Sequence, residues 1–194
     1  MRAKLADIKT FVQARMSEKR FNHVLGVIET AKELAVRHRV NIEDAEIAAL
    51  THDVAKEQPL EQTAGLLRIA GEGAYLEHSD KVWHAPMGAL IAKEALTIEN
   101  QDILNAIKYH TTGRPKMSDL EKVIFVADYT EPNRKFEGAA LVRKLWDDLD
   151  RAVYEILKQK VEKVTHSGLS MHPDTMTAYQ YYRALVFNQL ESSS

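Results

Sequence analysis

Helical periodicity runs through almost the whole chain and constrains its fold more than any other feature. Apolar residues recur at steps of three and four, between residues that favour helix ends. Asn22 and Asn41 are the expected N-caps of the second and third helices, and Ser118 with Glu121 forms a capping-box pattern. We expect helices over residues 8–16, 22–38, 42–56, 60–71, 85–96, 100–110, 118–129, 139–166 (with a break near Asp147) and 173–190.

Strand signals are weak by comparison. The stretch KVIFVADY could form a buried strand, but its cap and the spacing of Leu120, Ile124 and Ala127 favour a helix. The segments between helices, 73–83 among them, are expected to be loops. With 194 residues, 45% of them hydrophobic, the chain can bury one sizeable core. We therefore predict an all-α fold with a single domain over residues 1–194.

The charge balance and the hydropathy exclude several classes of partner. The formal net charge is -2, from 26 basic and 28 acidic residues, so there is no global footprint for a nucleic acid polymer or an anionic membrane. No apolar run approaches the length of a membrane span, and the charged N-terminus does not resemble a signal peptide. We expect a cytoplasmic protein.

The chain has no cysteine, which excludes disulfides, thiolate metal sites and a cysteine nucleophile. A metal site would have to use imidazole and carboxylate ligands. Asp128 is a candidate because it follows Leu120 and Ile124 on an apolar stripe, where an uncompensated carboxylate costs several kcal/mol. Four of the eight histidines are further candidates, because they lie at helix edges that face apolar stripes: His23, His52, His84 and His110. Taken singly, each of these candidates could instead be a buried histidine with one hydrogen bond, or a capping carboxylate.

The adjacent pair His52–Asp53 sharpens this hypothesis. Neighbouring residues of a helix point about 100° apart, so the pair can meet one ion only over the groove between them. On a continuous helix, Lys56 would share their face and suit a phosphate bound to the metal. The alternative is a solvated lysine at a helix end.

The ordered set of these residues resembles the HD-domain metal phosphohydrolases. The sequence segments around these residues are similar to the YqeK branch of that superfamily. The segments are HVLGVIETAKELA, HDVAKE, HAPMGA, AIKYHTTGRPKMSDLEKVIFVADYTEPNRKF and HPDT. That branch comprises bacterial symmetrical diadenosine tetraphosphate hydrolases. The resemblance covers about residues 20–178, and Thr51, where a hydrophobic residue is commoner, is a small departure.

The resemblance implies an HD-domain helical bundle, with a core over about 20–136 and additional C-terminal helices over 137–190. It also implies a divalent cofactor, iron, with manganese or another divalent ion as alternatives. Asp53 could bridge to a second ion held with His84 and His110, and whether one or two ions bind stays open. The ligands implied for the first ion are His23, His52, Asp53 and Asp128.

His84 and His110 have a second interpretation, as catalytic residues beside Asp53 that contact phosphate or protonate a leaving oxygen. TGRP is also a good turn sequence, and the arginine of EPNRKF could simply pair with nearby acids. His172 could either fix a C-terminal loop or contact the nucleotide. The candidates for substrate binding are Lys56, His84, His110, Thr111, Thr112, Arg114 and Arg134.

The function that the resemblance implies is symmetrical hydrolysis of diadenosine tetraphosphate to two ADP by a metal-activated water. The partner would be a dinucleoside polyphosphate or ADP. Alternatives are an HD-type nucleotidase acting on nucleoside monophosphates, and a nucleotide-binding sensor with little turnover. The oligomeric state stays open, with a homodimer as one alternative.

Overall fold

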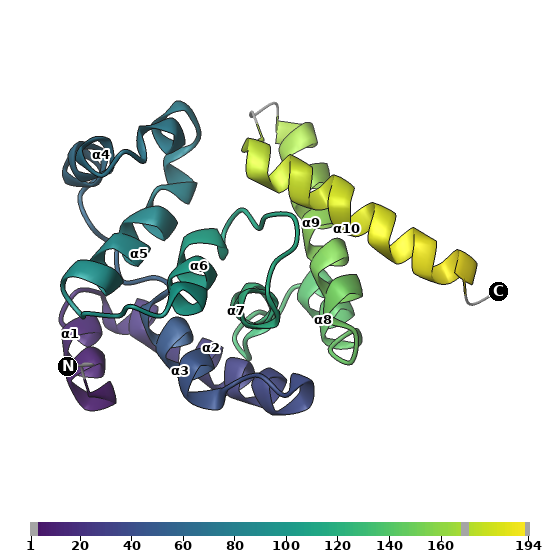
Figure 1. Cartoon of the computed structure of the whole chain (residues 1–194), viewed down its shortest axis with the longest axis horizontal. Coiled ribbons are helices and arrows are strands. Elements are labelled where there is room, and N and C mark those ends of the chain that lie inside the picture. Colours follow the sequence, from purple (N-terminus) through teal and green to yellow (C-terminus); the bar gives the residue numbers. More distant parts are fainter. Residues whose placement is uncertain (1–3, 168–170, 193–194) are drawn as a thin grey trace.

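The computed structural model describes residues 4–167 and 171–192, and within these ranges the chain is helical with no strand (Figure 1). The all-α prediction is confirmed. The helices are α1 Leu5–Gln13, α2 Glu18–His38, α3 Ile42–Thr51, α4 Leu60–Ile69, α5 His84–Glu94, α6 Gln101–Tyr109, α7 Asp119–Thr130, α8 Glu137–Arg143, α9 Leu149–Ser167 and α10 Pro173–Ser192.

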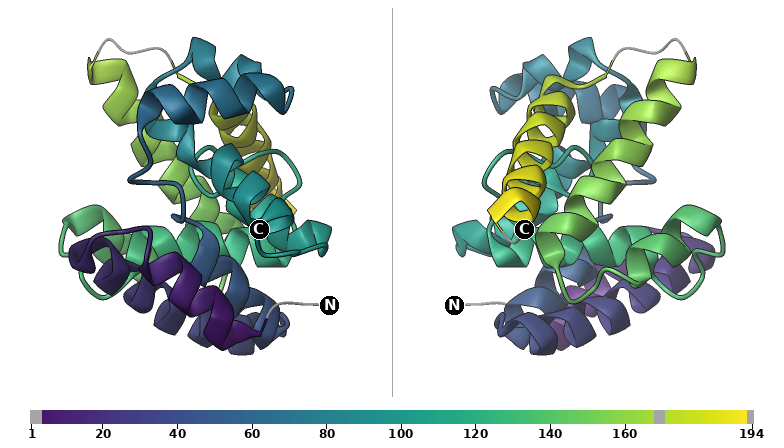
Figure 2. Two further views of the ribbon diagram at one scale, coloured as in Figure 1. Left: turned by 90° about the vertical axis from the view of Figure 1, so that its left-hand side faces the viewer. Right: turned by 90° about the vertical axis from the view of Figure 1, so that its right-hand side faces the viewer.

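Helix α7 lies at the centre of the fold and packs against α2, α6 and α9. Its residues Val123, Ile124, Val126 and Ala127 are completely buried, so its apolar stripe meets helices on several sides. Helices α9 and α10 lie side by side, and α9 packs against α7 (Figures 1 and 2). The core therefore joins the N-terminal helices to the C-terminal pair through α7.

Small residues let the helices around the end of α3 approach closely. Ala45, Ala48 and Ala49 are fully buried on α3. On α5, a Cβ added at Gly88 would lie 3.3 Å from the backbone oxygen of His52 and 3.3 Å from a methyl carbon of Ile107. Side chains larger than hydrogen at this position would push α5 away. This contact sets the distance between α5 and the turn that follows α3.

The start of α2 differs from the prediction. The helix begins at Glu18, with Ser17 rather than Asn22 as N-cap. The Ser17 hydroxyl accepts a hydrogen bond from the Arg20 amide, and the Glu57 carboxylate accepts bonds from the Ser17 amide and hydroxyl at 2.5 and 2.7 Å. A partner 40 residues away stabilises this cap, so local sequence underestimates the helix by about one turn.

The end of α3 also differs from the prediction, because the helix stops at Thr51 and does not continue to Lys56. The Thr51 hydroxyl donates to the Ile47 carbonyl, and the His52 ring contacts the Ala49 carbonyl at 2.7 Å. Beyond that point the chain forms turns in which amides bond carbonyls three residues back. His52, Asp53 and Lys56 therefore lie on a turn and do not share one helix face.

The first helix spans Leu5–Gln13 rather than the predicted 8–16, whereas several other predicted boundaries are confirmed. The Ser118–Glu121 capping box is present, Asn41 and Asn100 cap α3 and α6, and the break near Asp147 separates α8 from α9. The expected loop 73–83 contains two short 3-10 helices, η1 Gly73–Glu77 and η2 Asp80–Val82. Among the described residues, no helix combines the length and apolar character needed to cross a bilayer.

Candidate metal centre

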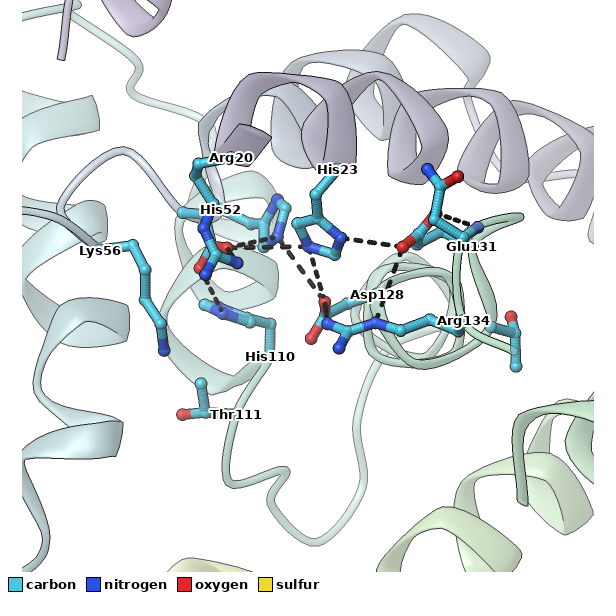
Figure 3. A network of polar contacts seen from close by, with 12 residues as sticks. Arg20, His23, His52, Lys56, His110, Thr111, Asp128, Glu131 and Arg134 are labelled. Atoms are coloured by element: carbon cyan, nitrogen blue, oxygen red, sulfur yellow. Dashed lines mark hydrogen bonds and ion pairs between the residues drawn. The ribbon is translucent and has the colours of Figure 1, made fainter. Parts of the chain in front are cut away.

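Histidine and aspartate side chains from separate segments converge at one point beside α7. Four of them are at least 95% buried, and Figure 3 shows His23, His52, His110 and Asp128 pointing toward one another. The structure thus brings together all the predicted ligands. They are His23 on α2, His52 and Asp53 on the turn after α3, His84 at the start of α5, His110 at the end of α6 and Asp128 in the last turn of α7.

One group of ligand atoms surrounds the Oδ2 atom of Asp53 and the Oδ1 atom of Asp128. His23 Nε2 lies 3.1 Å from Asp128 Oδ1 and 3.7 Å from Asp53 Oδ2. His52 Nε2 lies 3.5 Å from Asp53 Oδ2 and 3.9 Å from Asp128 Oδ1. Two imidazole nitrogens and two carboxylate oxygens therefore face a common point.

A second group forms on the other oxygen of Asp53. His84 Nε2 lies 3.2 Å from Asp53 Oδ1, and His110 Nε2 lies 3.6 Å from the same atom. The two ring nitrogens are 3.1 Å apart. Asp53 thus presents one oxygen to each group, which is the arrangement of a bridging carboxylate.

Hydrogen bonds fix which nitrogen of each ring faces this centre. The Nδ1 atoms of His52 and His110 donate to the Ala49 and Ile107 carbonyls, both at 2.7 Å. His23 Nδ1 donates to Glu131 Oε1 at 3.2 Å. With Nδ1 engaged in this way, Nε2 is the nitrogen of each ring that faces the centre, as in the outer-shell bonds of metal-binding histidines.

The protonation states also suit a cation. Burial alone would raise the pKa of Asp53, but His52 and the hydrogen bonds from His110 and His84 hold it well below its ordinary value. Burial lowers the pKa of His84 to about 4. Burial lowers the pKa of His52 as well, yet the charge and hydrogen bond of Asp53, together with the charge of Asp128, raise it overall. Ionised carboxylates and neutral imidazoles are the forms that bind metals, so Asp53 and His84 are in the binding form, whereas His52 would release its proton when an ion binds.

The residues present fit a divalent metal ion. The Nε2 atoms of His23 and His52 are buried and have no hydrogen-bond partner among the described residues. Native proteins leave few such atoms unsatisfied unless an ion or water completes them. A mixed imidazole and carboxylate donor set suits first-row divalent metals. The chemistry of the cluster thus indicates a divalent-metal site.

The HD domain family model matches residues 20–133, which is more than half of the chain and contains every residue of this cluster. The chain belongs to the HD-domain family. Relatives that the chain matches over more than 90% of their length place it in the YqeK branch of that family.

The chain is 41% identical over 172 residues to the symmetrical bis(5'-nucleosyl)-tetraphosphatase of Bacillus subtilis, covering 88% of this chain and 92% of the relative. It is 34% identical over 178 residues to the protein of the same name from Staphylococcus aureus, covering 90% and 92%. A crystal structure of an HD superfamily hydrolase from Clostridium acetobutylicum, described as involved in NAD metabolism, has a TM-score of 0.90 and 35% identity. That match covers 95% of this chain and 99% of the other.

Sequence reasoning missed Glu131, which contacts a ligand of this HD-domain centre. Its side chain is 98% buried, and it accepts hydrogen bonds from His23 Nδ1 and from the Asn133 amide. Glu131 follows Asp128 by three residues at the end of α7, so it reads as an ordinary C-terminal acid. Only the packing of α7 against α2 reveals that it orients the His23 ring.

Gly26 makes room for this contact, which leads to a prediction. A Cβ added there would lie 2.7 Å from Glu131 Oε2. We expect Gly26→Ala to displace Glu131 and to weaken metal binding by about 10- to 100-fold, the usual effect of disturbing an outer-shell carboxylate. Titration of the metal-free protein with Mn²⁺ measures the change. Gly65→Ala is the control, because a Cβ there meets nothing within 4 Å, and its metal affinity should equal that of the parent.

Arg20 was also missed, because the predicted start of α2 excluded it from the helix. Its Nη1 atom donates to Asp53 Oδ2 at 3.0 Å. Arg20 precedes His23 by three residues, so both side chains project from one face of α2. An N-cap at Ser17 predicts a helix that includes Arg20 and places it on the same face as His23. The guanidinium compensates part of the charge that Asp53 carries into the interior.

Two predicted substrate-binding cations lie at the edge of the centre. Lys56 Nζ lies 3.2 Å from His84 Nδ1 and is close to the cluster although it is not on a helix. Arg134 Nη2 donates to Asp128 Oδ1 at 3.3 Å, and its Nε lies 3.7 Å from Glu131 Oε1. The pairing of Arg134 with acids, left open by the sequence, thus occurs and also places Arg134 beside the cluster (Figure 3).

The residues after His110 divide into two kinds. The hydroxyls of Thr111 and Thr112 are both buried with no hydrogen-bond partner among the described residues, but Thr111 lies near the cluster (Figure 3), whereas the Thr112 side chain is completely buried in the interior. The structure does not bring Arg114 to the centre. Its Nε and Nη2 atoms donate to both oxygens of Glu121 at 2.7 and 2.9 Å, which favours the turn interpretation of TGRP.

Proposed function

We propose that this protein hydrolyses diadenosine tetraphosphate symmetrically and releases two ADP. The observation that carries the proposal is the shared Asp53, which offers its two oxygens to two separate groups of imidazole nitrogens. The relatives named as symmetrical bis(5'-nucleosyl)-tetraphosphatases support the choice of substrate, since this chain matches almost their entire length.

The proposed ligands are His23, His52, Asp53 and Asp128 for one ion, with Asp53, His84 and His110 for a second. When bound, a divalent ion supplies Lewis acidity and brings the pKa of water toward neutrality. We propose iron as the native metal. Imidazole and carboxylate donors also suit manganese, so iron and manganese are the first ions to compare.

The side chains around the centre have distinct proposed tasks. Asp53 and Asp128 hold negative charge beside the reacting phosphate, and Arg20 and Arg134 compensate it through the ion pairs described above. Lys56 and Arg134 offer donors to the non-bridging phosphate oxygens, whose charge must be neutralised in phosphoryl transfer. Burial lowers the pKa of His84 to about 4, so its ring is neutral near pH 7 and can offer a lone pair to a cation or to a hydrogen-bond donor.

The deciding experiment is incubation of the purified protein with diadenosine tetraphosphate and anaerobic iron, with all nucleotide products resolved by chromatography. We expect ADP alone, in a ratio of two per substrate consumed. A parallel incubation with AMP tests the nucleotidase alternative, which would yield adenosine and inorganic phosphate. Treatment with a chelator should stop the reaction, and iron should restore it.

Other product patterns would overturn the proposal. AMP with ATP would mean that the attack is asymmetrical. Phosphate release from AMP, with the dinucleotide left intact, would assign the nucleotidase activity. Stoichiometric nucleotide binding without turnover, in protein that contains metal, would assign the sensor alternative.

A further inference from the structure

A cavity of about 390 Å³ lies between the C-terminal helices and the segment that contains η1 and η2. Asp128 and Thr111 line it, so it adjoins the metal centre. His78, Val82, Lys160 and His172 also line it. Its volume falls in the range of sites that bind small organic ligands.

Two polar atoms of the cavity lining lack partners. The Thr111 hydroxyl and the Nδ1 atom of His78 are buried and have no hydrogen-bond partner among the described residues. Buried polar atoms are nearly always hydrogen-bonded in folded proteins. Two such atoms in one cavity therefore indicate a ligand with polar groups of its own.

Three lysines of the lining, Lys81, Lys160 and Lys163, supply the positive charge of this cavity, and Lys160 is the one that contacts Thr111. Its ammonium donates to the Thr111 carbonyl at 2.6 Å and lies 4.6 Å from the centre of the Phe125 ring. Within the described part of the chain, no carboxylate forms an ion pair with it. Burial, with the charges of Lys56 and Arg134, lowers the pKa of Lys160 to about 8, although Asp128 acts in the opposite direction. The lining thus carries three lysines and one carboxylate, Asp128, and this excess of positive charge favours an anionic ligand.

The rest of the cavity is suited to a nucleoside. Val82, Val164 and Met171 contribute apolar surface. His172 stacks on Tyr75 with ring centres 4.8 Å apart and meets His78 edge-on at 4.5 Å. Inorganic phosphate would satisfy only the cationic end beside Asp128. A ligand with phosphates at that end and a flat base beyond it would use both parts.

We infer that this cavity binds one nucleoside diphosphate arm of the dinucleoside polyphosphate, with Lys160 on its phosphates. The inference rests on the proposed function, because it takes the dinucleotide as the substrate. It assigns a role in substrate selection to α9 and α10, which lie outside the residues matched by the HD domain model. His172 then serves both of its predicted roles, since it packs on η1 and lines the nucleotide cavity.

The test compares Lys160→Met with Lys158→Met, a lysine on the same helix that pairs with Glu155 outside the cavity. ADP binding is measured by calorimetry in metal-loaded protein. Lys160→Met should weaken ADP at least about tenfold, the usual effect of losing a hydrogen bond between charged groups. The KM for diadenosine tetraphosphate should rise similarly. Metal content and hydrolysis of bis(p-nitrophenyl) phosphate, a small generic diester, should stay unchanged, and Lys158→Met should match the parent in every assay.

Three results would overturn the inference. ADP affinity of Lys160→Met within twofold of the parent is one. An equal loss of activity toward the dinucleotide and the small diester is another, because it would mean that Lys160 only supports the Thr111 backbone. Failure of Lys160→Arg to restore ADP binding is the third.

If Lys160→Met does not fold, Val82→Trp is tested instead, because the larger side chain fills the apolar end of the cavity. This variant must weaken ADP binding at least about tenfold while it retains metal.

The outcome for the cavity is separate from the outcome for the proposed function. A parent protein that binds ADP through Lys160 but does not cleave diadenosine tetraphosphate would retain the cavity as a nucleotide site and refute the hydrolase. A parent protein that cleaves the dinucleotide with no dependence on Lys160 would retain the hydrolase and refute the cavity.

Discussion

Asp53→Ala is expected to lower hydrolysis of diadenosine tetraphosphate by at least about a thousandfold and to remove bound metal from the protein. Among the described residues, Asp53 is the one carboxylate that faces both groups of histidine nitrogens, through a different oxygen for each. Its loss deprives both groups of an anionic ligand. Metal assistance is worth several kcal/mol of barrier height, and about 4 kcal/mol corresponds to three orders of magnitude in rate.

The measurement combines steady-state kinetics with elemental analysis of the purified variant. Asp147→Ala is the matched control, since its side chain is 87% exposed and pairs only with Arg37 among the described contacts. Circular dichroism checks that Asp53→Ala folds, and Asp53→Asn provides a variant of nearly unchanged shape. Activity within tenfold of the parent in both variants of Asp53 would refute the proposed centre.

Asp128→Ala is expected to cause a loss of similar size while leaving part of the metal binding intact. Asp128 contacts His23 and His52 at 3.1 and 3.9 Å, but it has no described contact with His84. Removing it takes one of the two carboxylates from the first group, which keeps His23, His52 and Asp53, and takes no ligand from the second group of Asp53, His84 and His110. If two ions bind the parent, the variant should keep the ion of the second group and bind the ion of the first group more weakly.

Titration with Mn²⁺ followed by elemental analysis distinguishes the partial loss of metal expected for Asp128→Ala from the complete loss expected for Asp53→Ala. Asp119→Ala on the same helix serves as control, because Asp119 is exposed and pairs with Lys122. Parent-like hydrolysis in Asp128→Ala would contradict the first group as the reactive one. Complete loss of metal from Asp128→Ala, in protein that remains folded, would contradict the division into two groups.

Local signals were sufficient where helix ends are determined by neighbouring residues. Ser118 and Glu121 cap α7 through contacts three residues apart, so their pattern predicted the structure correctly. Ser17 and Glu57 show the opposite case. Their hydrogen bonds join residues 40 positions apart, and the start of α2 and the placement of Arg20 could not be predicted from local sequence.

Among the side chains of the site, too, some positions were predictable from the sequence and others were not. The resemblance supplied the residues that converge at the centre, and their order in the chain was already informative. Lys160 and Glu131 gave no such signal, because each lies in an ordinary helical sequence context. Arg114, by contrast, looked suitable for phosphate binding but is held by Glu121 in a bidentate pair.

The sequence by itself determined the helical class, because apolar periodicity and capping residues act over one or two turns. It also determined the donor chemistry of the metal site, since a chain without cysteine can offer only imidazole and carboxylate here. Only the tertiary structure decided that α3 ends before His52, that Asp53 turns one oxygen to each group, and that α9 brings Lys160 to Thr111. Those features depend on packing between residues distant in the chain, which no local pattern encodes.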